Sequence, residues 1–127
     1  MFKIAKMHTG KQRPLEYYEG TANEAIALGE ALVLSSGKLT KCAATATPEF
    51  ISMGSGTGVA IPVVRVMEED VYYAPLSAAG TSLNVGDKVT LHTTGTEVTA
   101  TTTSGVFEIT QINGTSVGDT VLGMFRR

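Results

Sequence analysis

The stretch that decides the fold reads VGDKVTLHTTGTEVTATTTSGVFEI and covers residues 85–109. Eight threonines lie between residues 90 and 103, and β-branched residues of this kind fit a pleated, half-exposed strand surface. Glycines at positions 86, 95 and 105 divide the stretch into short runs, and glycine readily adopts the backbone angles of tight turns. This region therefore predicts short strands joined by turns.

The same alternation of short runs and turn residues extends through the rest of the chain. Turn-forming pairs or clusters occur at residues 36–37, 54–58, 94–95 and 113–114. The strands predicted between them are Glu30–Ser35, Leu39–Thr45, Phe50–Met53, Val59–Met67, Val71–Pro75, Lys88–Thr93, Glu97–Thr102, Gly105–Gln111 and Thr120–Phe125. Regular short strands with turns between them are typical of a β-sandwich or a small β-barrel. At 127 residues the chain predicts a small, single-domain, all-β protein.

A short motif occurs three times: an aliphatic residue, a glycine, an acid, any residue, and a second aliphatic residue. The copies start at Leu28, Val85 and Val117. We expect a turn that leads into a strand, with the glycine in a conformation unfavourable for other residues. The acid would accept hydrogen bonds from nearby backbone amides. The spacing of the copies is unequal, so the motif does not define a repeat array.

The first twenty residues differ from the rest. They include four of the ten basic side chains, and Gly10 and Pro14 interrupt any regular element. We expect an extended N-terminal arm over residues 1–20 and a β domain over residues 21–127. The arm is either a frayed terminus or a segment that becomes ordered on a partner. The following residues, 21–24, match a helix-opening capping box, and residues 25–28 would continue the helix. Gly29 and the apolar run after it favour a turn and a strand instead.

Composition limits the classes of partner. The net charge of −2 provides no overall positive field for nucleic acid, and a single cysteine cannot form an intramolecular disulfide. The most apolar stretch, Val59–Met67, is interrupted and too short to cross a bilayer. We expect no signal peptide, because residues 1–3 are not followed by an apolar run of about 7–15 residues. We therefore expect a soluble protein that is made in a cytoplasm and has neither a nucleic acid nor a membrane as a partner.

Residues that carry enzymatic chemistry are sparse. The cluster Gly54–Gly58 lacks the spacing of a dinucleotide or phosphate loop and precedes a predicted strand rather than a helix. His8, His92 and Cys42 are not spaced like the ligands of a zinc site. Cys42 is better explained as a small core residue. The acidic run 68–70 is better explained as a solvated turn. We predict no catalytic residue, no metal site and no cofactor, and therefore no enzyme.

The order of features resembles the head decoration, or cement, proteins of tailed bacteriophages. The resemblance begins with an extended N-terminal segment that ends in the run EYYEG at residues 16–20. It continues through AIALGEALVL at residues 25–34, SGKLTK at residues 36–41 and FISMG at residues 50–54. It implies a β domain on the outer surface of the virion capsid. There the protein would stabilise the expanded head by bridging neighbouring major capsid subunits, as a homo-oligomer in which a trimer is favoured.

Candidate capsid contacts follow from the basic and aromatic character of the N-terminal segment. They are Phe2, Lys3, Ile4, Lys6, Lys11, Arg13, Tyr17 and Tyr18. On this hypothesis, deletion of residues 1–14 leaves the domain folded but weakens its attachment. The alternative function is a ligand-binding β module, specific for a carbohydrate or a receptor, on a phage fibre or surface.

Overall fold

The computed structural model describes residues 1–7 and 14–126, and every regular element in these ranges is a β-strand. The strands are β1 (Lys3–Lys6), β2 (Glu16–Glu19), β3 (Ala25–Ile26), β4 (Ala31–Ser35), β5 (Lys38–Lys41), β6 (Phe50–Ser52), β7 (Gly56–Thr57), β8 (Ala60–Arg65), β9 (Val71–Pro75), β10 (Lys88–Val89), β11 (Phe107–Ile112) and β12 (Thr120–Phe125). The prediction of an all-β fold is confirmed.

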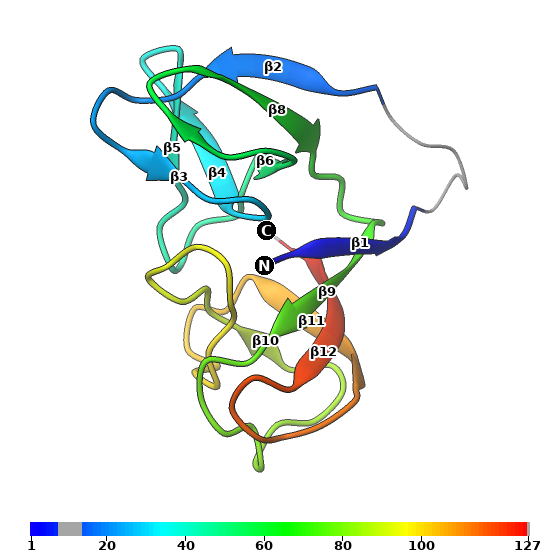
Figure 1. Cartoon of the computed structure of the whole chain (residues 1–127). Helices are drawn as coiled ribbons and strands as arrows, with labels where there is room; N and C mark the ends of the chain where they lie inside the picture. Colours follow the sequence, from blue (N-terminus) through cyan, green and yellow to red (C-terminus); the bar gives the residue numbers. More distant parts are fainter. Residues whose placement is uncertain (8–13, 127) are drawn as a thin grey trace.

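Two antiparallel sheets organise the molecule, and neither closes into a barrel. One five-stranded sheet has the order β2-β8-β6-β4-β5, and the other has the order β1-β9-β12-β11-β10. The first occupies the upper part of the view in Figure 1 and the second the lower part. We call residues 14–66 the upper lobe, and residues 1–7 with 67–126 the lower lobe. The short strands β3 and β7 pair separately at the margin of the upper lobe.

The upper sheet contributes to two hydrophobic cores because its strands alternate. In β6, Phe50 packs into a small core inside the upper lobe, while the next residue, Ile51, belongs to a larger core shared with the lower lobe. In β4, Ala31 and Leu32 divide between the two cores in the same way. Successive strand residues point to opposite faces, so the central strands of the upper sheet separate the two cores. The two lobes consequently share the larger core.

All three copies of the aliphatic–glycine–acid motif form the predicted turn. The glycines at positions 29, 86 and 118 have φ angles of 75°, 98° and 88°. In each copy the acid accepts a hydrogen bond from the backbone N–H three residues earlier. These bonds are Ala27 to Glu30 at 3.1 Å, Asn84 to Asp87 at 2.9 Å, and Ser116 to Asp119 at 3.0 Å. The motif is confirmed as a turn that leads into a strand.

The predicted strand Glu97–Thr102 is not a regular strand. Val98 forms isolated bridges with Leu76 and Leu91, but the threonines beside it bond to nearby groups. The Thr99 hydroxyl lies 2.7 Å from the Thr90 hydroxyl and accepts the N–H of Thr101 at 3.0 Å. Threonine side chains that bond locally to the backbone compete with sheet pairing. The Thr-rich composition predicted β structure correctly but overestimated its regularity.

The segment after residue 20 forms no helix, in agreement with the turn-and-strand interpretation. The N–H of Glu24 donates to the carbonyl of Thr21 at 3.2 Å, and the short strand β3 follows. The carboxylate of Glu24 accepts the N–H of Lys41 at 2.7 Å and the hydroxyl of Thr40 at 2.8 Å. Glu24 is therefore used to cover the edge of β5 rather than to cap a helix.

The first twenty residues are extended, but those that the structure describes are part of the two sheets rather than a separate arm. Strand β1 pairs with β9, with Lys3 opposite Tyr73, and β2 pairs with β8. Phe2 is 2% exposed, and its ring centroid lies 5.2 Å from that of Phe125. The division at residue 20 is therefore corrected, because burial of Phe2 and pairing of β1 stabilise this segment within the domain.

Candidate interaction surface

The outer face of the lower sheet carries a row of side chains that crosses four strands. Lys3 of β1 is opposite Tyr73 of β9, Tyr73 is opposite Leu122 of β12, and Leu122 is opposite Gln111 of β11. Directly opposed residues point to the same face of a sheet. The intervening residues, such as Tyr72 and Val121, are fully buried in the larger core. The row therefore lies on the face turned away from that core.

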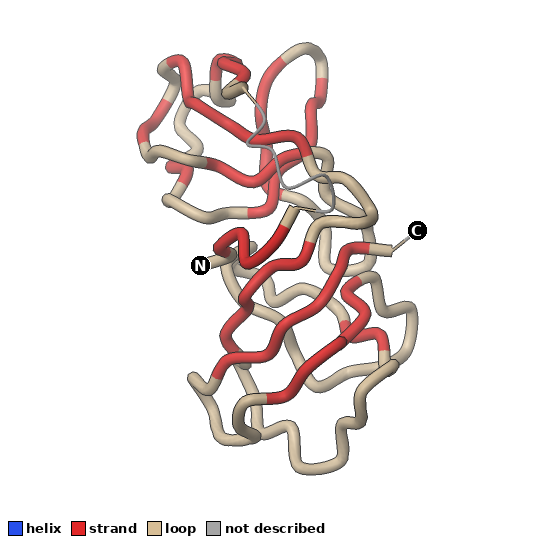
Figure 2. The backbone as a smooth tube through the Cα atoms, turned by 90° about the vertical axis from the view of Figure 1, so that its right-hand side faces the viewer, coloured by secondary structure: helices blue, strands red, loops and turns tan. Residues whose placement is uncertain are grey.

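This face is partly apolar and open to solvent. Tyr73 is 40% exposed, Leu122 and Met124 are half-buried, and Lys3 and Lys6 are exposed along β1. Figure 2 shows the strands of the lower sheet lying side by side in the lower lobe. A half-exposed apolar centre beside basic side chains is suited to contact with another protein surface.

A shallow hollow of about 540 Å³ lies at the β1 side of this face. Its lining residues come from β1, β9 and β12 and the chain next to them: Met1, Lys3, Tyr73, Ala74, Pro75 and Thr120. Burial lowers the pKa of the Met1 amine, and the negative charge of Glu97 opposes this effect. The hollow thus combines an aromatic ring and a proline with a lysine at its margin. We call the outer face and this hollow the β1–β11 surface.

The sequence-predicted contacts fall into different environments. Phe2 is removed from the set, because its side chain is in the core and cannot reach a partner. Ile4 is half-buried and packs against the same core. Lys3 is exposed opposite Tyr73, and Lys6 is exposed opposite Val71. The remaining basic candidates, Lys11 and Arg13, lie outside the described residues.

The two tyrosines of β2 lie on the upper sheet and not on the β1–β11 surface. Tyr17 is 64% exposed. Tyr18 instead packs its ring 5.1 Å from the ring of Phe50, and its hydroxyl donates to Glu16 at 2.8 Å. Tyr17 therefore remains available for contacts, whereas Tyr18 mainly stabilises the small upper core.

An ion pair holds the outer edge of the upper sheet. The guanidinium of Arg65 donates to both carboxylate oxygens of Glu16, at 3.1 and 2.9 Å, and lies 4.8 Å from the centroid of the Phe50 ring. The Arg65 bonds lower the pKa of the Glu16 carboxyl. The bond to Glu16 raises the pKa of Tyr18. These interactions fix β2 against β8 and explain the locally perturbed ionisation without a catalytic role.

Sequence reasoning missed the members of the β1–β11 surface that lie on β9 and β12: Tyr73, Pro75, Thr120, Leu122 and Met124. The predicted strands Val71–Pro75 and Thr120–Phe125 coincide with β9 and β12. Their alternation was therefore readable from the sequence. The missing information was the pairing of β1 with β9, which brings the two exposed lysines next to these side chains.

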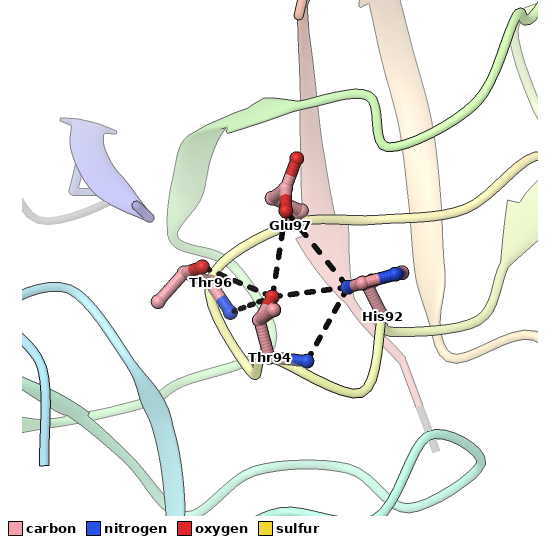
Figure 3. A network of polar contacts seen from close by, with 4 residues as sticks. All are labelled: His92, Thr94, Thr96 and Glu97. Carbon is pink, nitrogen blue, oxygen red and sulfur yellow. Dashed lines mark hydrogen bonds and ion pairs between the residues drawn. The ribbon is translucent and has the colours of Figure 1, made fainter. Parts of the chain in front are cut away.

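Figure 3 shows a network of polar contacts among His92, Thr94, Thr96 and Glu97, in the turn between Leu91 and Val98. The ring nitrogen Nδ1 of His92 lies 3.1 Å from the Thr94 hydroxyl and 3.8 Å from the Glu97 carboxylate. The Thr94 hydroxyl also contacts Glu97 at 3.5 Å and accepts the hydroxyl of Thr96 at 3.1 Å. The cluster is local to six consecutive residues, and these bonds stabilise the turn itself.

Other chemistry-bearing residues have structural environments. Cys42 is 3% exposed, its thiol donates to the carbonyl of Ala46 at 3.2 Å, and burial raises its pKa to about 11. Its predicted role as a small core residue is confirmed. Within residues 1–7 and 14–126, no group of three or more His, Cys, Asp or Glu side chains is placed to hold a metal ion. The glycine cluster at residues 54–58 leads into strand β8, as predicted.

No protein-family model matches the chain, and no curated protein sequence is significantly similar to it. In the described part of the chain, no helix is long and apolar enough to cross a membrane.

Proposed function

We propose that the protein is a structural virion component that binds the outer surface of a phage capsid and stabilises the expanded head by bridging major capsid subunits. The observation that carries this proposal is the β1–β11 surface, where Lys3, Tyr73 and Leu122 lie side by side on an open sheet face. The resemblance of the sequence to decoration proteins supplies the identity of the partner. The localisation that follows is the outer capsid surface, after synthesis in the host cytoplasm.

The stabilisation would be additive, because each bound copy adds one more interface between capsid subunits. A stable protein interface buries roughly 1,600 Å² in total, about half of it from each partner. The open face of the five-stranded lower sheet would contribute one side of such an interface. Tyr73 and Leu122 would be buried against the capsid, while Lys3 and Lys6 would meet acidic side chains at the rim. A homo-oligomer, with a trimer favoured, would engage several capsid subunits at once and gain avidity without new contacts.

The test is binding to undecorated, expanded capsids of the parent phage. Tyr73→Ala and Lys3→Glu should each weaken binding, because central aromatic residues and charge matching at the rim contribute to affinity and association. We expect at least roughly a tenfold rise in Kd for Tyr73→Ala, the change that corresponds to about 1.4 kcal/mol. Capsid occupancy would be measured by sedimentation and electron microscopy.

Matched controls come from the upper sheet. Lys38→Glu makes the same charge change on strand β5, and Tyr17→Ala removes an exposed tyrosine from β2. Both should bind normally, and all four variants should keep the melting temperature of the parent protein. Loss of binding in the Tyr17 variant with normal binding of the Tyr73 variant would assign the contact to the upper sheet and contradict the proposed surface.

The hollow beside Tyr73 favours a second candidate, a carbohydrate-binding or receptor-binding β module. An exposed tyrosine with a proline and a threonine around a depression is a surface on which a sugar ring can stack. A glycan array, followed by calorimetry with wild type and Tyr73→Ala, separates the two functions. Glycan binding that Tyr73→Ala abolishes, without any binding to capsids, would favour this alternative.

A further inference from the structure

A buried carboxyl lies where the two lobes meet. Glu30, immediately before β4, is 2% exposed. Its Oε1 accepts the N–H of Ala27 at 3.1 Å, whereas its Oε2 is buried without a hydrogen-bond partner among the described residues. An ionised carboxylate in such a position lacks the donors that normally compensate for the loss of water. The neutral acid is therefore the form that this environment tolerates better.

Ser52 forms hydrogen bonds with the backbone of the turn that carries Glu30. The N–H of Glu30 donates to the Ser52 hydroxyl at 2.9 Å, and this hydroxyl donates to the carbonyl of Ala27. The N–H of Ser52 donates to the carbonyl of Glu30 at 3.0 Å. These bonds fix the turn that carries Glu30, so the carboxyl has little freedom to move into solvent.

A hairpin of the lower lobe, residues 91–98, covers this carboxyl. A Cβ atom at Gly95 would lie 2.9 Å from Cγ of Glu30, and Gly95 itself is buried. The N–H of Ala31 donates to the carbonyl of Gly95 at 2.8 Å, and the N–H of Leu91 donates to the carbonyl of Ala44 at 2.9 Å. These two backbone bonds join the hairpin to the upper lobe, and the first of them involves the residue next to Glu30.

Few charges face the carboxyl. Burial raises the pKa of Glu30, and Glu24 adds to this effect, while the N–H of Ala27 and the charge of Lys41 oppose it. On the hairpin, His92 and Glu97 lie beside each other. The Met1 side chain lies close to Gly29, and the Met1 amine has Glu97 and Lys3 as its charged neighbours.

We propose that Glu30 is a proton-controlled joint between the two lobes: its neutral carboxyl holds hairpin 91–98 against β4, and its ionisation loosens the hairpin. The direction follows from linkage. The folded pKa is raised above the unfolded one, so the folded joint binds the proton more tightly. Its stability is therefore fully present below the ordinary carboxyl pKa and falls as the pH rises through the raised folded value. This inference does not depend on the proposed function.

The test is hydrogen exchange of the Ala31 and Leu91 amides, whose bonds join the hairpin to the upper lobe. Protection, corrected for the intrinsic exchange rate, should fall as the pH rises from about 4 to about 8, by roughly tenfold for each unit of pKa shift. Amides of β12 provide an internal reference. In Glu30→Gln, which keeps the shape but cannot ionise, the protection of both amides should be independent of pH over this range.

Two further variants distinguish Glu30 from the ionisable groups near it. An imidazole also changes charge near neutral pH, so His92→Gln should leave the pH dependence in place if Glu30 causes it. Glu24→Gln removes a negative charge that raises the pKa of Glu30, and should therefore move the midpoint to lower pH. If Glu30→Gln fails to fold, the test rests on two measurements: the pH dependence of amide protection in the wild type, and the midpoint of that dependence in Glu24→Gln. A flat wild-type profile, or a dependence that disappears in His92→Gln, would overturn the proposal.

Discussion

The two lobes have the same kind of sheet but very different interiors. The upper lobe encloses a small core whose largest member is Phe50, whereas the lower lobe builds on a cluster of four aromatic rings. That cluster consists of Phe2, Tyr72, Phe107 and Phe125. The upper sheet also places residues such as Ile51 and Val64 in the larger core. A small core alone gives marginal stability, so the upper lobe depends on the lower one.

The largest effect on stability is expected at Phe2, a member of the aromatic cluster of the lower lobe. The side chain contacts two rings of the cluster, with centroids 5.2 and 6.0 Å away, and its N–H donates to Gly29 of the upper lobe at 2.9 Å. Phe2→Ala should lower the free energy of unfolding by about 3–5 kcal/mol, as other buried phenylalanine truncations do. Urea denaturation followed by circular dichroism measures the loss.

The matched change in the upper lobe is Phe50→Ala. We expect a loss of similar size and one cooperative transition in both variants, because the lobes share an interior. Two separate transitions in Phe50→Ala, with the lower lobe unaffected, would show that the lobes unfold independently. A small effect of Phe2→Ala would instead restore the view of the N-terminal segment as an arm.

The next effect concerns Ser52, which connects two backbone groups at the junction. Ser52→Ala leaves the N–H of Glu30 and the carbonyl of Ala27 without this partner. We expect a loss of about 1–3 kcal/mol, the usual cost of a buried polar group without a hydrogen bond. Ser35→Ala, at an exposed position in β4, is the control and should be close to neutral. Equal stability of the two variants would contradict the importance assigned to the junction.

The turn glycines should show a smaller effect that is similar in both lobes. Gly118 of the lower lobe and Gly37 of the upper lobe have φ angles of 88° and 78°, and a Cβ at either position meets no atom within 4 Å. Replacement by valine therefore adds backbone strain without a clash. We expect about 1–2 kcal/mol for each variant. Unchanged melting of both would show that the positive φ angle is not required there.

The smallest effect is expected at the surface. The amine of Lys38 lies 3.5 Å from the Glu19 carboxylate, and both side chains are largely exposed. Exposed ion pairs contribute little, so Lys38→Ala should change the free energy of unfolding by less than about 1 kcal/mol. Thermal melting at low and high salt measures this difference. A larger, salt-dependent loss would indicate that this pair helps to hold the margin of the upper lobe.

The sequence predicted the turns and strand bounds better than it predicted which distant segments come into contact. Ser36 and Gly37 both have positive φ angles, as the turn between β4 and β5 requires. The bounds of Val71–Pro75 were also predicted correctly, because their alternation is a local property. The assignment of Phe2 to a partner contact failed, since an apolar residue near a terminus can enter the core or remain exposed. Its immediate neighbours do not decide between these outcomes.

The sequence by itself determined the all-β class and the local conformation of the glycine–acid turns, because both depend on residues within a few positions of each other. The tertiary structure alone decided that Lys3 lies beside Tyr73, and that Gly95 covers the buried carboxyl of Glu30. These contacts join segments that are far apart in the chain. The first contact forms only when β1 pairs with β9 inside the lower lobe, and the second only when the two lobes pack over a common core. The candidate surface and the proposed joint are therefore properties of the fold.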